Sequence, residues 1–455
     1  MNQKVLKFGG TSMGSFNALE KVVSIIQKNL EDNIVQVITC SAMSQVTNKL
    51  IEIGNLAENG EVEKTQNLFK SIQLLHFDVA MEFGVLPDFE KNTENIWTDL
   101  HDLFHGICMI HELSDRSLAY LSSFGEKLST RLLTCILNKD SEIAIQLDSS
   151  FVKTLDDDYL EADIDWKKTK KNVKKEVLPY LAKKIPIVTG FFGTNDKNIT
   201  ALLGRGGSDY SAAILAVCLG IKTVEIWTDV DGFLSADPRI LKEAHIIPEI
   251  GYTEASELCS FGAKVLHPKT IRPVIDFGGE VWIKNTFSPE KPGTMIVQEM
   301  GDTMKSVLSI TSKKTVIFTL NLFGVKMGTP RSKVYYSLFK ICNKFNVCID
   351  MIASSEASVS FCLEPSWYEN KDFISALKEV APLDIENNKS ILCIVSPSNV
   401  KGRVGVAASF FQALAVENIS AEMYSQNKQE VAQLIVVKNE DCDKAICAIH
   451  NQFSK

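Results

Sequence analysis

Apolar and polar residues alternate over the first 300 residues in blocks that predict strands followed by helices. Five short apolar runs are typical of buried strands, at residues 4–8, 34–39, 143–147, 185–189 and 223–227. Helical spacing of apolar residues begins near Asn17, which with Glu20 fits a capping box, and residues 60–140 read as mostly helical. This alternation predicts a mostly parallel sheet with helices on both faces. Ligands of such sheets bind beyond the carboxyl ends of the strands.

The pattern of predicted strands and helices changes near residue 300, after Pro289 and Pro292-Gly293. Shorter elements follow in the order strand, helix, strand, strand, helix, strand, and this order is repeated approximately once. The predicted strands are 306–311, 316–320, 348–352, 359–363, 391–395, 421–424 and 433–437, and the predicted helices are 333–345, 372–380, 404–416 and 442–451. We therefore expect two βαββαβ units in about 150 residues.

Composition narrows the functional class. A length of 455 residues predicts two or three domains, and a net charge of −8 argues against a dedicated nucleic-acid binder. Eight lysines between Trp166 and Lys184 lie on a segment with an apolar helical stripe, so a solvated helix face is favoured there. Eleven cysteines without a C-x-x-C pair are typical of buried thiols in a reducing compartment. Without a signal-peptide pattern at Met1–Lys4, we expect a cytoplasmic protein.

The segment Lys7-Phe-Gly-Gly-Thr-Ser12 follows the first predicted strand directly. Paired glycines let backbone N–H groups approach phosphate oxygens, and Lys7 adds a full positive charge. The segment is not a Walker P-loop, because the lysine precedes the glycines and Ser15 stands where that motif requires lysine. A simple strand-to-helix turn with a surface lysine explains this segment equally well.

A second glycine-rich segment, Gly204-Arg-Gly-Gly-Ser-Asp209, precedes a predicted helix at 210–219. Ser208 as N-cap and Asp209 in the first turn are explained by helix capping alone. Three glycines around Arg205 are better explained by a loop that presents N–H groups and a guanidinium to an anion. Anion binding is therefore favoured over capping.

Two further segments carry polar residues at strand or helix ends. Trp227-Thr-Asp-Val-Asp-Gly232, continuing to Asp237-Pro-Arg239, fails the calcium-loop pattern and favours a loop near a nucleotide or Mg²⁺, with an ordinary Asx-turn as the alternative. Phe261-Gly-Ala-Lys-Val-Leu-His-Pro268 places Lys264 in an apolar run, where a lysine that reaches the surface is the simpler explanation.

Taken together and in order, these segments resemble the amino-acid kinase family, and within it the aspartokinases of the monofunctional, lysine-sensitive type. The matching segments cover nearly the whole chain: Lys7–Ser12, Thr47-Asn48, Phe124-Gly-Glu126, Gly190-Phe-Phe-Gly193, Leu203–Asp209, Trp227-Thr-Asp229, Asp237-Pro-Arg239 and Phe261–Pro268. The resemblance implies a carbamate-kinase-like, three-layer α/β catalytic domain over residues 1–295. It also implies a regulatory region over 296–455 with two α+β ACT domains, one of about 314–385 inserted within 300–313 plus 386–455.

The implied reaction is ATP-dependent phosphorylation of the L-aspartate β-carboxylate with Mg²⁺, the entry to lysine, threonine and methionine synthesis. A carboxylate is ionised at pH 7, so no general base is needed, and catalysis reduces to positioning and charge neutralisation. The resemblance assigns catalysis to Lys7 and Asp209, with the Gly9 and Gly10 amides at the transferred phosphoryl group. Arg205 is expected to hold the substrate α-carboxylate, while Glu126 and Asp209 hold its α-ammonium.

Further contacts follow from the same resemblance. The implied substrate-binding residues are Thr47, Glu126, Phe191, Arg205, Gly207, Ser208 and Asp209. The implied phosphate- and nucleotide-binding residues are Gly9, Gly10, Ser12, Thr228, Asp229, Leu234, Arg239, Lys264 and Val265. No protein side chain is expected to bind the metal, because Mg²⁺ is held mainly by the nucleotide phosphates. Leu234 stands where close relatives carry a tyrosine, which puts one adenine-side contact in doubt.

Paired ACT units imply feedback by an amino-acid end product, lysine first, and a homodimer or dimer of dimers formed through these domains. The residues matching the effector stretch are Asp350, Ser354, Ser355 and Glu356, although the adjoining loop 324–335 departs from the family pattern. Two other hypotheses stay open. One is a kinase acting on glutamate, acetylglutamate or carbamate, and the other is a non-catalytic amino-acid sensor. No nucleic-acid or membrane partner is expected.

Overall fold

The computed structural model describes residues 3–155, 158–181, 183–263, 265–301, 307–324, 330–398, 402–426, 428–429 and 431–453. The chain forms two compact units. The N-terminal unit comprises Met1–Phe233 and Val265–Gln298, and the C-terminal unit comprises Leu234–Lys264 and Glu299–Lys455. The segment Leu234–Lys264 thus interrupts the first unit, although no shift in composition marks it in the sequence.

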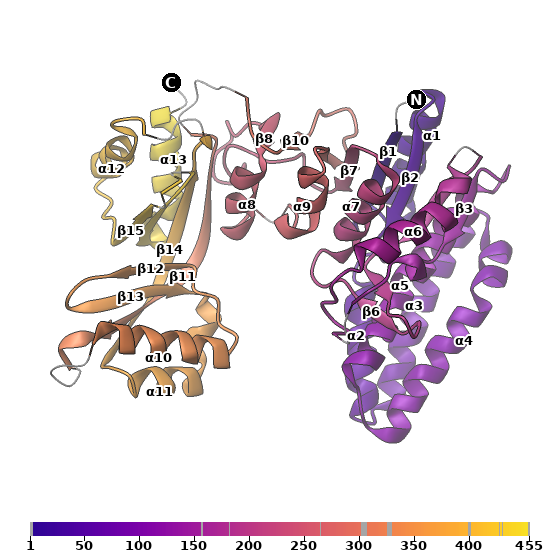
Figure 1. Ribbon diagram of the computed structural model, residues 1–455, viewed down its shortest axis with the longest axis horizontal. Helices are drawn as coiled ribbons and strands as arrows, with labels where there is room; N and C mark the ends of the chain where they lie inside the picture. Colours follow the sequence, from indigo (N-terminus) through magenta and orange to yellow (C-terminus); the bar gives the residue numbers. More distant parts are fainter. Residues whose placement is uncertain are drawn as a thin grey trace. The chain divides into compact units, whose positions relative to one another are not determined.

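The N-terminal unit is built on a mostly parallel sheet, as predicted (Figure 1). Its strands are ordered β3-β4-β2-β1-β7-β9-β10, and neighbours are parallel except for the antiparallel pair β9–β10. The bounds are β1 (Gln3–Phe8), β2 (Val35–Cys40), β3 (Ala144–Leu147), β4 (Ile185–Thr189), β7 (Thr223–Thr228), β9 (Glu280–Asn285) and β10 (Thr294–Val297). A separate antiparallel pair is formed by β5 (Phe192–Thr194) and β6 (Thr200–Leu202).

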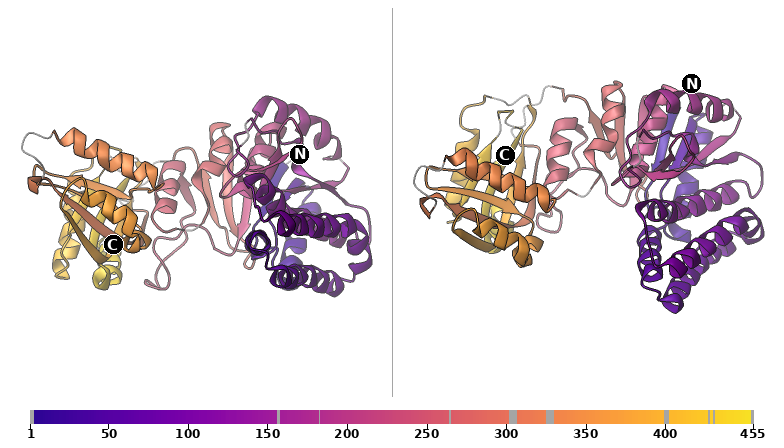
Figure 2. Two further views of the ribbon diagram at one scale, coloured as in Figure 1. Left: turned by 90° about the horizontal axis from the view of Figure 1, so that it is seen from below. Right: turned by 60° about the horizontal axis from the view of Figure 1, so that its bottom comes forward.

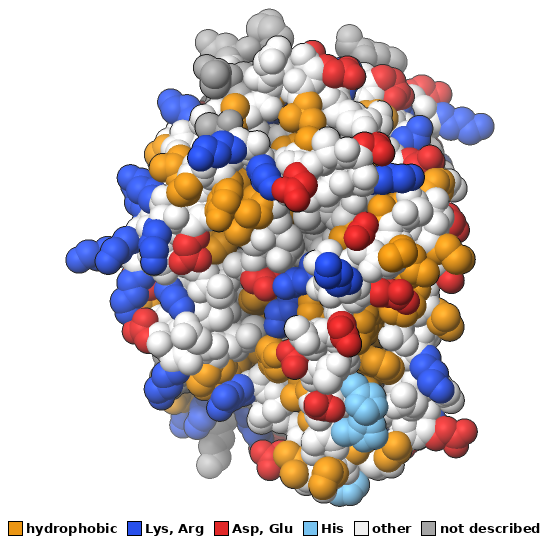
Figure 3. Space-filling view, turned by 90° about the vertical axis from the view of Figure 1, so that its right-hand side faces the viewer, with side chains coloured by type: hydrophobic (Ala, Val, Ile, Leu, Met, Phe, Trp, Pro, Cys, Tyr) orange, Lys and Arg blue, Asp and Glu red, His pale blue; other side chains and the backbone are white. Residues whose placement is uncertain are grey.

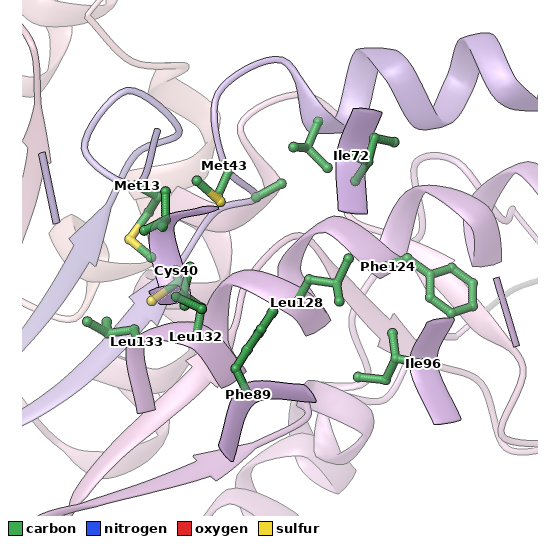
Figure 4. Close-up of a cluster of buried hydrophobic side chains, with 14 of the residues drawn as sticks. Met13, Cys40, Met43, Ile72, Phe89, Ile96, Phe124, Leu128, Leu132 and Leu133 are labelled. Atoms are coloured by element: carbon green, nitrogen blue, oxygen red, sulfur yellow. The ribbon is translucent and has the colours of Figure 1, made fainter. Parts of the chain in front are cut away.

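Helices cover both faces of this sheet. The first five share one core with the strands, and Figure 4 shows part of it, including Cys40, Phe89 and Leu128. These helices are α1 (Phe16–Glu31), α2 (Val46–Glu58), α3 (Val62–Glu82), α4 (Leu86–Ile110) and α5 (Asp115–Leu137). Side chains alternate along a strand, so Leu6 and Phe8 face this core while Lys7 faces the opposite side. The opposite face is covered by α7 (Gly207–Leu219) and α9 (Pro268–Asp276), and α6 (Trp166–Glu176) packs on α7.

The capping box predicted at the start of α1 is wrong. Helix α1 begins at Phe16, and Ser15 is its N-cap, because the Ser15 hydroxyl accepts a hydrogen bond of 3.3 Å from the Ala18 N–H. Asn17 and Glu20 therefore lie inside the helix and form no capping box. Serine and asparagine cap helices about equally well, so the sequence alone did not separate the two starts.

The C-terminal unit contains a six-stranded antiparallel sheet of order β12-β13-β11-β14-β16-β15 (Figures 1 and 2). Its strands are β11 (Ser309–Asn321), β12 (Met351–Ser354), β13 (Ser358–Leu363), β14 (Leu383–Val395), β15 (Met423–Gln426) and β16 (Ala432–Lys438). Its helices are α10 (Arg331–Lys344), α11 (Lys371–Lys378), α12 (Val406–Val416) and α13 (Cys442–Phe453). The predicted strand–helix order is confirmed, but the strands expected at 306–311 and 316–320 are one strand, β11, with an irregularity between Thr315 and Ile317.

Two cores fill this unit. One packs α10 and α11 on the β12 side of the sheet, and the other packs α12 and α13 on the β16 side. Ala236 and Leu241 of the inserted segment belong to the second core. The segment also contains β8 (Glu249–Gly251) and α8 (Tyr252–Ser260), and strand β11 binds it directly. Ser309 Oγ donates to the Leu234 carbonyl at 2.7 Å, and the Ile310 N–H donates to the Ser235 carbonyl at 2.9 Å.

Figure 3 shows one face of the molecule that carries both basic and acidic side chains. Lys and Arg side chains gather toward the left of this view, and most of the Asp and Glu side chains lie at the top and right. Among the described residues, no helix is long and apolar enough to span a membrane. None of the eleven cysteines forms a disulfide bond in the structure.

Candidate active site

A cavity of about 450 Å³ lies in the N-terminal unit, beyond the carboxyl ends of four parallel strands. Gly9–Thr11 follow β1, Ser41–Ser44 follow β2, and Phe191 follows β4, while Thr228 ends β7 and Asp229 follows it. Glu126 of α5 and the first turns of α2 and α7 complete the lining. The convergence of these loops confirms the expectation drawn from strand–helix alternation.

A buried ion pair crosses one wall of the cavity. Lys7 Nζ lies 2.7 Å from Asp209 Oδ1, and both residues are less than one-tenth exposed. The pair forms because Lys7 points from β1 toward the helix face that carries Asp209. Two charges buried at this depth need each other unless a ligand replaces one of them. An anion entering the cavity would therefore compete with Asp209 for the lysine.

The glycine pair after β1 offers one backbone donor. The Gly9 N–H donates to the Trp227 carbonyl at 3.0 Å and so continues the hydrogen bonding between β1 and β7. The Gly10 N–H makes no hydrogen bond within the described part of the chain. A side chain at Gly10 would meet the Ala42 carbonyl at 3.3 Å, so glycine keeps this approach open. Of the two amides assigned to phosphate, only that of Gly10 is available.

Ser12 has a different environment from the one predicted. Its hydroxyl donates to the Trp227 carbonyl at 3.2 Å and lies 2.7 Å from Thr286 Oγ1, and its side chain is fully buried. Ser12 does not line the cavity and instead holds the glycine loop against β7. Thr286, which follows β9, takes part in this support, and nothing in its sequence context indicated it.

Two helix N-termini border the cavity. Helix α7 starts at Gly207 with Gly206 as its cap, in the left-handed region at φ 73°, so the prediction that Ser208 is the N-cap is wrong. Helix α2 starts at Val46 after Gln45, which is also left-handed at φ 65°. Thr47 and Ser208 stand in these first turns, where backbone N–H groups carry partial positive charge. Two such ends at one cavity favour an anionic ligand.

Glu126 is the unusual acid of the site. Its Oε1 accepts a hydrogen bond of 3.1 Å from the Ala42 N–H, while Oε2 is buried and has no partner among the described residues. Burial raises the pKa of Glu126 to about 8, although the Ala42 N–H and the charge of Lys7 act in the opposite direction. A cationic ligand group would satisfy Oε2 and lower that pKa again.

Most of the predicted substrate- and nucleotide-binding residues line the cavity. These eleven are Lys7, Gly9, Gly10, Thr47, Glu126, Phe191, Gly207, Ser208, Asp209, Thr228 and Asp229. Arg205 does not line it; its side chain is exposed and makes no ion pair or hydrogen bond within the described residues. Val265 belongs to the same unit but also lies outside the lining.

The other described residues predicted to bind the nucleotide are not part of the cavity lining. Leu234 and Arg239 are part of the C-terminal unit. Arg239 is held by its neighbour Asp237, with Nε 3.0 Å from Oδ1 and Nη2 2.5 Å from Oδ2. This hydrogen bonding lowers the pKa of Asp237. Lys264 lies outside the described residues.

The predicted effector residues bind groups of their own chain. Asp350 Oδ1 lies 2.9 Å from Lys313 Nζ, and burial raises the pKa of Asp350 against the effect of that lysine. Ser355 Oγ accepts hydrogen bonds from the Ala357 and Ser358 N–H groups, and Glu356 pairs with Arg331 at 3.0 Å.

These effector residues do not form one cluster. Strand β12 separates Asp350 from Ser355, and at about 3.3 Å per residue this is more than 10 Å. Ser354 is the last residue of that strand and is exposed. A small ligand bound at Asp350 would therefore not reach Glu356 without a rearrangement.

Comparison with known proteins adds an independent finding. The model of the amino acid kinase family matches residues 2–285, and a model of the ACT domain matches residues 393–453. Aspartokinase 2, chloroplastic, of Arabidopsis thaliana is 32% identical over 471 residues, covering 99% of this chain and 84% of that protein. Lysine-sensitive aspartokinase 3 of Escherichia coli is 28% identical and covers 99% of this chain and 98% of that protein.

Solved structures of aspartokinases have the same fold. Aspartokinase III of E. coli in complex with aspartate and ADP is 25% identical, with a TM-score of 0.81 and full coverage of both chains. The same enzyme in complex with lysine and aspartate is 26% identical, with a TM-score of 0.85 and 99% coverage of both chains. The resemblance read from the eight sequence segments is therefore confirmed.

Proposed function

The chain belongs to the amino acid kinase family and, within it, to the aspartokinases, and from this premise we propose how its cavity phosphorylates aspartate. The reaction transfers the terminal phosphoryl group of ATP to the β-carboxylate, which is already ionised at neutral pH. The protein's task is to place the two substrates in line and to neutralise the charge that develops on the transferred group.

The anion-binding half of the cavity serves the nucleotide phosphates. Lys7, the free Gly10 N–H and the two helix N-termini all present positive charge to it. The oxygen atoms of Asp209 and Asp229 border the same space and are ligands of the type that Mg²⁺ prefers. We propose that Mg²⁺ enters with the nucleotide, held mainly by its phosphates, and neutralises part of their charge.

The observation that carries the proposal is the unpartnered Oε2 of Glu126 beside the Lys7–Asp209 pair. A buried carboxylate oxygen needs a cation, and the α-ammonium of an amino acid supplies one. Glu126 thus selects amino acids over simple dicarboxylic acids. Arg205, exposed and unpaired in the free protein, is proposed to turn onto the α-carboxylate when aspartate binds.

Regulation and assembly are proposed on the same premise. The E. coli relative has been crystallised with lysine, and lysine is the effector that we propose here, with Asp350 as the contact to its ammonium group. We further propose a homodimer or dimer of dimers joined through the ACT domains, and a cytoplasmic location consistent with eleven free thiols.

A coupled ADP-release assay tests the reaction. We expect turnover with L-aspartate, trapping of the acyl phosphate as a hydroxamate, and no turnover with succinate, which lacks the ammonium group. Acetylglutamate, glutamate and carbamate serve as the competing substrates. If one of these competing substrates were turned over as fast as L-aspartate, the substrate assignment would be wrong. If neither L-aspartate nor any competing substrate led to ADP release, the hypothesis of a non-catalytic sensor would be favoured. Repeating the assay with lysine, threonine and methionine tests the effector.

A further inference from the structure

Phe191, which lines the cavity, has a backbone conformation that aromatic residues rarely adopt. Its φ is 75°, in the left-handed region, where the Cβ atom of an L-residue comes too close to the following carbonyl oxygen. Asparagine, glutamine and histidine supply the other described non-glycine residues with positive φ, so Phe191 is the sole apolar one. Strain of this kind persists only where the surroundings hold it in place.

Two hydrogen bonds hold the Phe191 backbone. Its N–H donates to Ser211 Oγ at 3.0 Å, and its carbonyl accepts from the Leu203 N–H at 2.8 Å. The Ser211 hydroxyl in turn donates to the Gly207 carbonyl at 2.9 Å. Ser211 is 1% exposed and lies one helical turn after Gly207 in α7. One buried hydroxyl therefore joins the Phe191 turn to the first turn of α7.

The two turns are also fitted to each other sterically. A Cβ atom at Gly207 would lie 2.8 Å from Phe191 Cδ2, and a Cβ atom at Gly190 would lie 2.7 Å from Ser208 Cβ. The ring of Phe191 thus packs directly on the backbone that carries Ser208 and Asp209. A change in the Phe191 backbone would displace this ring and disturb both neighbours in the cavity.

We propose that Ser211, which does not line the cavity, is a positioning residue that sets the amino-acid side of the site by holding Phe191 in its left-handed conformation. Without the hydroxyl, the Phe191 N–H loses its acceptor, and of the two hydrogen bonds only the one from the Leu203 N–H remains to offset the cost of the strained φ. The backbone then relaxes toward negative φ, and the ring leaves its place against Gly207. This inference rests on the proposed function, because Phe191 contacts aspartate only by resemblance.

The test is the variant Ser211→Ala in the full chain, studied by steady-state kinetics. We expect the KM for aspartate to rise about tenfold, while the KM for ATP stays within twofold, because the Gly9–Gly10 loop is separate from this contact. Ser211→Thr, which keeps a hydroxyl, should restore most of the affinity for aspartate. Discrimination against glutamate should fall in Ser211→Ala, because the ring that limits the space is no longer fixed.

Ser123→Ala is the matched control. Ser123 is also fully buried, on α5 of the same unit, but its hydroxyl only donates to the Tyr120 carbonyl of its own helix. We expect unchanged KM values for it. An unchanged KM for aspartate in Ser211→Ala, or equal increases for aspartate and ATP, would overturn the positioning role. If the wild-type protein released no ADP with aspartate, the proposed function would fail instead, so the two failures are distinguishable.

Discussion

The cavity of the N-terminal unit and the predicted effector residues of the C-terminal unit each contain a carboxylate with one buried oxygen that has no partner among the described residues, but their surroundings differ. In the cavity this oxygen is Oε2 of Glu126, and the lining also includes the Gly10 N–H and two helix N-termini, none of which is paired with a side chain of the described residues. At Asp350, where the oxygen is Oδ2, Lys313 binds Oδ1, Ser355 accepts N–H groups of its own turn, and Glu356 pairs with Arg331 of α10. A ligand of the cavity must therefore replace the Lys7–Asp209 pair, whereas a ligand of the predicted effector residues must replace several internal contacts.

The largest expected effect comes from the lysine of the cavity. Lys7→Met should lower kcat by about 10²–10³, because one preorganised charge at the transferred phosphoryl group is lost. Steady-state ADP release measures this change. Lys4→Met is the control on the same strand, since its partner Glu225 keeps a contact of 3.2 Å with Lys284. Similar losses of kcat in both variants would mean that Lys7 acts only through the fold.

Arg205→Ala should act on binding and not on turnover. Loss of charge-assisted hydrogen bonds worth about 1.5–3 kcal/mol predicts a KM for aspartate that rises roughly 10- to 100-fold. The melting temperature should change little, because Arg205 is exposed and makes no hydrogen bond or ion pair within the described residues of the free protein. Arg272→Ala, which removes an exposed pair with Asp276, is the control. A fall in kcat without a rise in KM would contradict the assigned role.

The raised pKa of Glu126 predicts that aspartate binding is coupled to the release of a proton. With a pKa of about 8 in the empty cavity, the carboxyl is mostly protonated at pH 7, and an ammonium ligand must displace that proton. Aspartate binding should therefore release most of one proton at pH 7, and the KM for aspartate should fall between pH 6.5 and 8.5. Titration calorimetry in buffers of different ionisation enthalpy measures the release. Glu126→Gln should abolish it, and release that persists in this variant would point to another group.

The same raised pKa affects stability with a definite sign. A carboxyl that holds its proton more tightly in the folded state stabilises that state below pH 4.5, and this contribution is lost as pH rises toward 8. The ligand-free protein should lose more stability between pH 5 and 8 than Glu126→Gln does. Thermal unfolding at several pH values measures the difference. A parallel pH dependence in the two proteins would place the Glu126 pKa near its ordinary value.

A smaller effect is expected in the C-terminal unit. Asp350→Asn should raise the concentration of lysine required for half-inhibition about tenfold, because a charged contact to the effector is lost while Lys313 keeps Glu364 at 3.2 Å. Glu356→Gln should change it less than twofold and alter unfolding free energy by under about 0.5 kcal/mol, since its pair with Arg331 is exposed. If Glu356→Gln raised the lysine concentration for half-inhibition more than Asp350→Asn did, the effector site would lie nearer to α10.

Much of the cavity was predictable because parallel strands bring their carboxyl ends to one edge. The loops after β1 and β7 were assigned from their own residues and those after β2 and β4 by the resemblance, and all four line the cavity. Details that depend on backbone dihedral angles were not predictable from the sequence. Ser208 looked like the N-cap of α7, yet Gly206 occupies the left-handed cap position, and the sequence contains no signal that separates these two residues.

Contacts between distant segments were also hidden. The resemblance implied that Ser12 contacts phosphate, but its hydroxyl is satisfied by Trp227 and Thr286, more than 200 residues away. Ala236 and Leu241 read as part of the catalytic region, yet they pack in the core of the C-terminal unit. Only the tertiary structure decides which of several apolar surfaces such residues join.

The length of β11 and β14 has a consequence for how the regulatory region can be divided. Each strand has 13 residues and pairs along almost its whole length with the other. Each strand therefore contributes residues both to the half that contains α10 and α11 and to the half that contains α12 and α13. A fragment carrying one half would expose unpaired strand edges and should aggregate. The two halves should therefore melt in a single transition, and neither half is expected to fold without the other.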